Sequence, residues 1–128
     1  MDAPFIYLNT TGIKEGQLEA WMKYFAEFAE FIEANEPRLL HFGTYVNEEG
    51  TEQTIVQVHP DTESMAFHMG LLADHASAAA DFLDFSTTRS QVYGEPDPSV
   101  LEQIRGFAPH IPVTVGTPGG GFARFLAG

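Results

Sequence analysis

The hydrophobic positions along the chain predict an alternation of short strands and amphipathic helices. Between about residues 16 and 35, apolar side chains recur every three or four residues, and the glutamates mostly fall on other sides of the helical wheel. This helix should end at Glu36 and Pro37, because proline cannot continue the backbone hydrogen bonds. Before it, residues 5–9 are aromatic and β-branched and run into a turn-prone Thr-Thr-Gly sequence. They predict a strand with apolar residues on both faces, so both faces should be covered.

Residues 39–47 and 51–59 predict a hairpin whose loop is Glu48, Glu49 and Gly50. A loop of that length would place even and odd positions on opposite faces, and a loop one residue longer or shorter would scramble the division. The predicted even face is aliphatic: Leu40, Phe42, Val46, Val56 and Val58. The predicted odd face mixes aromatic and hydrogen-bonding groups, as a ligand-lining wall does: His41, Tyr45, Ile55, Gln57 and His59.

The rest of the chain continues the alternation. Asp61 is a suitable N-cap for a second helix, which Gly70 and a fresh cap at Asp74 would break into two pieces. A strand over 87–93, a helix over 98–107, a strand over 113–115 and a last strand over 122–125 are expected after it. The order through residue 94 is that of a ferredoxin-like βαββαβ plait of the α+β class. We therefore expect a single domain over residues 1–128, with a core over 1–94 and a C-terminal helix and strand extension over 95–128.

Composition further limits the number of domains, the partners and the chemistry that the chain can have. The 128 residues, 44% of them hydrophobic, suffice for one core. Six basic against 18 acidic residues give a formal charge of -12, which disfavours nucleic acid and anionic membranes as partners. The absence of cysteine excludes disulfides, thiolate nucleophiles and cysteine-ligated metals. No signal-peptide pattern and no apolar run of membrane-spanning length occurs, so a soluble, cytoplasmic protein is expected.

Several stretches, in this order, resemble the antibiotic-biosynthesis-monooxygenase family of dimeric α+β barrels. They are Ile6 to Leu8, Asn35 to Tyr45, Ile55 to Asp61 and Met65 to Met69. The resemblance covers about residues 4 to 94 and implies a homodimer whose sheets pack face to face. It also implies a chemically mixed group, which includes cofactor-free oxygenation of polycyclic aromatic substrates and haem degradation. The asparagine, tryptophan and histidine of the haem-degrading branch cannot be placed together in this sequence.

The resemblance implies a histidine on the second helix, and His68 matches it. Its apolar neighbours would lower its pKa by desolvation and leave a neutral imidazole able to act as a general base; alternatively, it is a core histidine with both nitrogens hydrogen-bonded. His59 is the second candidate base. It and Gln57 stand where many members carry an aromatic residue and a glutamate. With Tyr45 and His41, they would orient a phenol-like substrate or line a polar dimer interface.

Aromatic residues of the first helix are the other candidates for substrate contact. Trp21 and Phe25 lie on its core stripe, and they would form either a pocket wall or ordinary core packing. A second stripe of Tyr24, Phe28 and Phe31 widens the apolar face and would belong to the core or meet a second subunit.

No metal or cofactor site is expected. His68 and His75 would lie about 10 Å apart along one helix at 1.5 Å per residue, too far for a shared ion. The three glycines over 119–121 lack the lysine and hydroxyl residue of a phosphate-binding loop.

Two hypotheses about function follow from the residues and the resemblance together. The first is a cofactor-independent monooxygenase, or a related small-molecule enzyme, acting on an apolar aromatic substrate. The alternative is a non-catalytic homodimer of the same fold that binds a small apolar ligand or has a structural role. Both have a second copy of the chain as partner.

Overall fold

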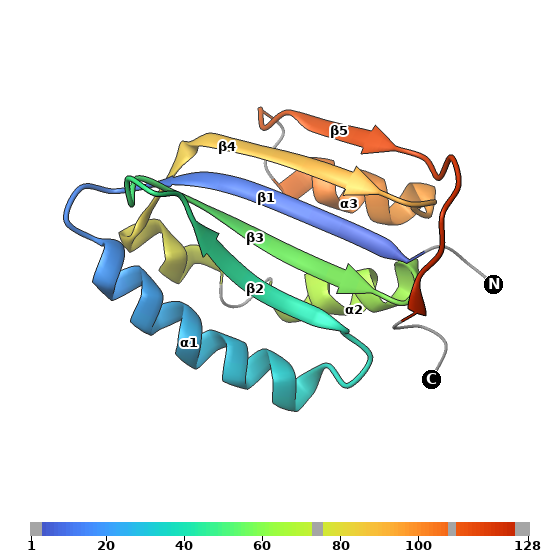
Figure 1. Ribbon diagram of the computed structural model, residues 1–128, viewed down its shortest axis with the longest axis horizontal. Coiled ribbons are helices and arrows are strands. Elements are labelled where there is room, and N and C mark those ends of the chain that lie inside the picture. The colour runs from blue at the N-terminus through green and yellow to red at the C-terminus, as the bar shows by residue number, and fades with distance from the viewer. Residues whose placement is uncertain (1–3, 73–75, 108–109, 125–128) are drawn as a thin grey trace.

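A computed structural model describes residues 4–72, 76–107 and 110–124 as one sheet covered by helices on one face (Figure 1). In these residues the sheet has five strands in the order β2-β3-β1-β4-β5. The elements, in chain order, are β1 (Phe5–Ile13), α1 (Leu18–Asn35), β2 (His41–Val46), β3 (Glu52–His59), α2 (Thr62–Leu72), the 3-10 helix η1 (Ala76–Asp81), β4 (Leu83–Tyr93), α3 (Pro98–Phe107) and β5 (Val113–Gly116). The predicted α+β class and the βαββαβ order of the core are confirmed. No helix in the described ranges is long and apolar enough to cross a bilayer.

The C-terminal extension adds a helix and an edge strand to the plait. The predicted helix over 98–107 is confirmed as α3, and β5 pairs with β4 in parallel, whereas the other strand pairs are antiparallel. The predicted last strand is wrong over residues 122–124, which form no strand, and residue 125 lies outside the described residues. Phe122 is 83% exposed there, so it has no apolar surface against which a strand would pack.

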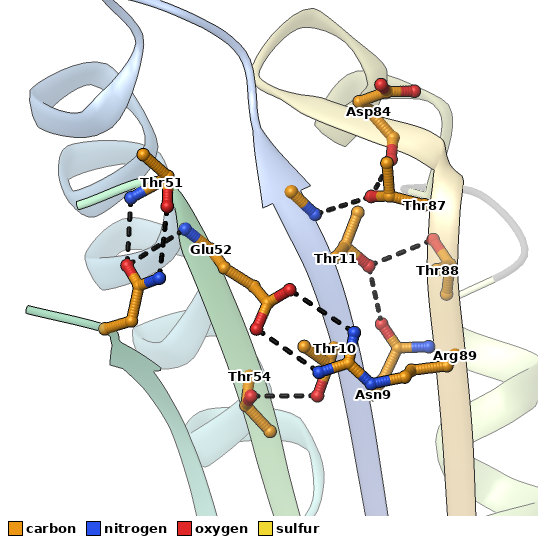
Figure 2. A network of polar contacts seen from close by, with 12 residues as sticks. Asn9, Thr10, Thr11, Thr51, Glu52, Thr54, Asp84, Thr87, Thr88 and Arg89 are labelled. Atoms are coloured by element: carbon orange, nitrogen blue, oxygen red, sulfur yellow. Dashed lines mark hydrogen bonds and ion pairs between the residues drawn. The ribbon is translucent and has the colours of Figure 1, made fainter. Parts of the chain in front are cut away.

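β1 is longer than the sequence indicated. The predicted turn at Thr10, Thr11 and Gly12 is wrong, because these residues continue the strand between β3 and β4. The pairing with β4 is irregular between Thr10 and Gly12, where the Gly12 amide donates to Oγ1 of Thr87 at 2.7 Å (Figure 2). A Cβ at position 12 would lie 3.0 Å from that oxygen, so glycine permits the close approach. β4 likewise begins at Leu83, four residues before the predicted start.

The hairpin β2–β3 forms as predicted, but its register is shifted by one residue. Phe42 pairs with Gln57 and Val46 with Gln53, because the loop has one more residue than expected. Asn47 explains the longer loop, since its side-chain Oδ1 accepts from the amides of residues 51 and 52 at 2.9 and 3.1 Å (Figure 2). The predicted division into an even and an odd face is therefore wrong.

The helix ends follow local chemistry. α1 begins two residues later than predicted and ends before Glu36 and Pro37, as the proline required. The Asp61 side chain caps α2 as predicted, accepting from the Ser64 amide at 3.1 Å. α2 runs through Gly70 to Leu72 and η1 begins at Ala76, so the predicted break falls between them, outside the described ranges. Asp74 and His75 lie outside the described residues.

Two hydrophobic clusters fill the space between the sheet and the helices. The α1 cluster consists of the buried residues Trp21, Phe25 and Leu83. The α3 cluster consists of the buried residues Phe5, Met65, Val92, Val100 and Ile104. The first lies under α1 and the second under α2 and α3, so the core has two parts along the sheet.

We call the helix-covered side of the sheet its inner face and the opposite side its outer face. The register places four half-buried aliphatic side chains at one end of the outer face: Ile6, Leu8, Val56 and Val58. At the other end it places a polar group, in which Glu52 pairs with Arg89 and Thr10 with Thr54 (Figure 2). No helix of the described chain covers this face (Figure 1).

Candidate functional site

A cavity of about 130 Å³ lies on the inner face, where the α1 cluster and the α3 cluster meet. Its aromatic wall comes from α1: Trp21, Tyr24, Phe25 and Phe28. Its aliphatic wall comes from α2, α3 and the segment leading into β5: Met69, Leu72, Ile104, Ile111 and Val113. A cavity of about 150 Å³ can hold a benzene molecule. This volume has room for about one ring, and the cavity is partly open to solvent, so a larger ligand can extend beyond it.

The sheet side of the cavity carries a cluster of polar groups from β1 and β4. The Asn9 amide nitrogen donates to the Tyr7 hydroxyl at 3.3 Å and to Ser90 Oγ at 3.0 Å, and these two hydroxyl oxygens lie 3.1 Å apart. The two hydroxyl groups have two hydrogens, and only one of them can lie between the two oxygens. The other hydrogen is available to an acceptor in the cavity, which all three residues line.

The orientation of the Asn9 amide is fixed by a hydrogen bond from Thr11 on the same strand. Thr11 donates to its carbonyl oxygen at 3.2 Å, and Thr11 in turn lies 3.0 Å from the buried Thr88 hydroxyl (Figure 2). Because the oxygen is held by Thr11, the nitrogen of the amide must face Tyr7 and Ser90. The polar cluster is thus pre-organised by neighbours on the same two strands.

Gln57 brings a further amide to the cavity wall, and His59 holds it. Gln57 Oε1 can only accept, so His59 Nε2–H donates to it at 2.9 Å, and His59 Nδ1 accepts from the Ser64 hydroxyl at 2.7 Å. Burial, assisted by nearby His68, lowers the pKa of His59 to about 3, so the ring is neutral near pH 7. The Gln57 amide nitrogen has no hydrogen-bond partner among the described residues and is free to donate to a ligand.

His68 forms a second buried polar pair. Its Nδ1–H donates to Glu36 Oε2 at 2.6 Å, and the side chains are 0% and 2% exposed. His68 Nε2 and Glu36 Oε1 are buried without a partner among the described residues. The ring packs against Phe42 and His59, with centroid separations of 5.5 and 5.8 Å. Neither His68 nor His59 is among the residues that line the cavity.

The sequence-predicted residues divide between the two faces of the sheet. Trp21, Phe25 and Gln57 line the cavity. His41 and Tyr45 do not share a face with them, because the one-residue register shift moves both to the outer face. There the Tyr45 hydroxyl lies 3.0 Å from His41 Nε2, and the tyrosine is 55% exposed.

Sequence reasoning did not single out the Tyr7, Asn9 and Ser90 cluster. Ser90 lies more than 80 residues from Tyr7 and Asn9 in sequence, so no local motif joins them. The available signal was the spacing of two residues between Tyr7, Asn9 and Thr11, which places all three on one face of a strand.

The described lining of the cavity contains no acidic, basic or histidine side chain. Burial raises the pKa of the Tyr24 hydroxyl, so this group stays protonated near pH 7. No group of three potential metal ligands occurs in the described residues. The site therefore offers neutral hydrogen-bond donors inside an apolar enclosure.

These features define a class of fold: a ferredoxin-like α+β sheet with helices on one face, a cavity beneath them and a parallel edge strand. This is the fold expected from the resemblance to antibiotic-biosynthesis-monooxygenase-like proteins, and that expectation is confirmed.

Comparisons with known proteins show the same fold at low sequence identity. MupZ from Pseudomonas fluorescens matches with a TM-score of 0.75 and 24% identity, over 96% of each chain. A "putative antibiotic biosynthesis monooxygenase" from Nitrosomonas europaea matches with a TM-score of 0.63 and 15% identity, over 77% of this chain and 95% of that one. No protein-family model and no curated protein sequence matches the chain.

A variant of SnoaB from Streptomyces nogalater, described as a cofactor-independent oxygenase, also has this fold. It matches with a TM-score of 0.60 and 13% identity, over 73% of this chain and 94% of that one. SnoaB and the Nitrosomonas protein leave about a quarter of this chain uncovered.

Proposed function

We propose that the chain is a cofactor-independent monooxygenase, or a closely related small-molecule enzyme, that takes an apolar aromatic substrate into the cavity. The observation that carries the proposal is the free hydroxyl hydrogen of the Tyr7 and Ser90 pair, held by Asn9 inside an apolar enclosure. A donor in such a place stabilises an oxygen atom that becomes negative during a reaction. The fold similarity to a named cofactor-independent oxygenase supports the reaction type.

The proposed reaction begins with an activated CH₂ group beside a substrate carbonyl. Loss of one proton to water at the open end of the cavity gives an enolate, whose oxygen accepts hydrogen bonds from the Tyr7 and Ser90 pair and from the Gln57 amide. The enolate carbon reduces dioxygen and, with one proton, becomes a hydroperoxide. Loss of water then leaves a new carbonyl group. One oxygen atom ends in the product and the other in water, so the substrate supplies all the electrons.

The two predicted catalytic histidines take different roles in this proposal. His59 is a positioning residue, because its neutral ring holds Oε1 of Gln57, a residue that lines the cavity. His68 was the first candidate base. In this proposal it lies outside the cavity lining, where it pairs with Glu36. The rings of Phe42 and His59 pack against the His68 imidazole.

Oxygen consumption tests the catalytic proposal. Phenylacetone, 2-tetralone and anthrone are enolisable aromatic ketones of one, two and three rings. We expect turnover of at least one of them, with kcat/KM lowered about a hundredfold by Tyr7→Phe, as for other removed oxyanion donors. Tyr45→Phe is the matched control, because it removes a tyrosine hydroxyl from the outer face and should leave kcat/KM unchanged.

The non-catalytic alternative is favoured by one observation, the absence of carboxylate, basic and histidine side chains from the described cavity lining. If the ketones bind with affinity that depends on Tyr7 but consume no oxygen, the chain is a ligand-binding protein. If Tyr7→Phe and Tyr45→Phe change turnover equally, the cavity is not the reaction site.

We further propose that two copies of the chain associate through the outer face. Four aliphatic side chains meet on one end of that face, and no described helix covers them (Figure 1). Tyr93, which pairs with Ile6 on this face, is 39% exposed and adds apolar area to it. An uncovered apolar sheet face is a typical interface in small α+β domains. The resemblance stated above implies the same arrangement.

Sedimentation equilibrium tests the association. Wild-type protein should sediment as a dimer at micromolar concentration, and Val58→Lys should be a monomer because it places a charge in the aliphatic patch. Thr54→Lys is the matched control, on the same strand and face but at the polar end, and should stay dimeric. A wild-type monomer at millimolar concentration contradicts the proposal.

A further inference from the structure

The C-terminal segment α3–β5 forms part of the cavity wall. Ile104 of α3, Ile111, and Val113 of β5 all line the cavity. Ile104 is 5% exposed and belongs to the α3 cluster, against which Val113 packs. The segment α3–β5 therefore shapes the cavity and not only the surface.

The lining of the cavity changes in character across the sheet. Aromatic side chains of α1 lie on the side of β2 and β3, where Phe42 and Ile55 pack against the α1 cluster. The polar cluster of Tyr7 and Ser90 lies on the central strands β1 and β4. Aliphatic side chains of the segment α3–β5 lie beyond it, at the β5 edge. A ligand that matches all three parts has an oxygen atom between an aromatic and an aliphatic arm.

We propose that the cavity selects ligands with an oxygen-bearing group between an aromatic arm and an aliphatic arm, and that Ile104, Ile111 and Val113 set the length of the aliphatic arm. The aromatic arm packs against Trp21 and Phe25. The oxygen accepts the free hydroxyl hydrogen of the Tyr7 and Ser90 pair. The aliphatic arm runs toward β5 until it meets the three side chains. This proposal rests on the ligand-binding role of the cavity proposed above, and it does not depend on turnover.

Alkyl phenyl ketones of increasing chain length, from acetophenone to octanophenone, have this arrangement of ring, carbonyl and alkyl arm. Trp21 is the only tryptophan and lines the cavity, so quenching of its fluorescence reports binding. In wild-type protein the affinity should rise about threefold to fourfold with each methylene that finds space, and then fall once the arm meets the wall. Ile104→Ala and Val113→Ala should move the best-binding ketone to a longer chain, and Ile111→Phe should move it to a shorter one.

Val100→Ala is the matched control. Val100 is 4% exposed, lies on the same helix and belongs to the same cluster as Ile104, but it does not line the cavity. Loosening of α3 alone would shift the preferred chain length equally in Val100→Ala and Ile104→Ala, and that result would overturn the proposal. Val113→Ala keeps the test open if Ile104→Ala fails to fold, because Val113 is only half-buried.

The remaining outcomes separate this proposal from the one on which it rests. If the ketones bind and their preferred length is the same in every variant, the segment does not set specificity, although the cavity still binds ligands. If no ketone quenches Trp21 in the wild-type protein, the cavity does not take ring-bearing ligands, and both proposals fall.

Discussion

The two faces of the sheet are built from the same strands, yet their polar groups have different surroundings. On the inner face, Tyr7 shares hydrogen bonds with Asn9 and Ser90 at the wall of a cavity. On the outer face, Tyr45 bonds to His41 and is more than half exposed. Water can replace the outer hydrogen bond at little cost, but it cannot replace the inner ones as freely. The same side chain should therefore contribute differently to stability on the two faces, and substitutions can measure the difference.

The largest expected difference in the free energy of unfolding is between the loss of a buried polar pair and the loss of an exposed one. His68→Ala leaves the Glu36 carboxyl buried without its partner, and it should lower the free energy of unfolding by about 3–5 kcal/mol. Arg89→Ala removes the ion pair with Glu52 on the outer face, where the side chains are 58% and 38% exposed. It should lower the free energy of unfolding by less than about 1 kcal/mol. Urea unfolding measures both, and equal losses would show that the inner pair is solvated.

The next effect is the pH dependence that His59 confers. Its pKa is lowered to about 3 in the folded protein, so in the unfolded chain it binds a proton below about pH 6.5 and in the folded protein it does not. The stability that the neutral His59 ring contributes is present above pH 6.5. As the pH falls below that value, the free energy of unfolding decreases by about 1.4 kcal/mol per pH unit. Between pH 6.5 and about 4.5 the wild-type protein should therefore lose about 3 kcal/mol from this residue.

Urea unfolding at several pH values checks this expectation. His59→Gln should show a shallower dependence on pH in that window, by about one proton. His41→Gln, on the exposed outer face, should follow the wild-type curve. A His59→Gln curve parallel to that of the wild-type protein would mean that His59 titrates normally in the folded state.

The smallest expected difference in the free energy of unfolding is between tyrosine-to-phenylalanine substitutions on the two faces. Tyr7→Phe removes a half-buried hydroxyl with two polar neighbours and should lower the free energy of unfolding by about 1 kcal/mol. Tyr45→Phe removes an exposed hydroxyl and should change it by less than about 0.5 kcal/mol. Thermal unfolding resolves a difference of this size, and the reverse order would contradict the assignment of faces.

The elements of the fold could be predicted where local pattern and tertiary structure agree. The apolar spacing of α1 and its stop at Pro37 required no knowledge of the sheet. The second half of β1 could not be predicted, because Thr10, Thr11 and Gly12 favour a turn locally and become a strand only through pairing on both sides. The hairpin register depended on the side chain of Asn47, whose two backbone hydrogen bonds make the loop one residue longer.

The candidate site could be predicted only in part for the same reason. Trp21 and Phe25 were found because a helix stripe shows in the sequence. Gln57 was found as well, but its predicted neighbours His41 and Tyr45 moved to the other face with the register. The cluster of Tyr7 and Ser90 depends on the pairing of distant strands, which no local pattern shows.

A crystal structure of the protein with hexanophenone bound tests the central claim most directly. The account predicts that the ketone lies on the inner face, with its ring against Trp21, its carbonyl oxygen within hydrogen-bond distance of Tyr7 or Ser90, and its alkyl arm toward Val113. A ketone bound on the outer face, or in the cavity with its carbonyl turned away from both hydroxyl groups, would contradict it.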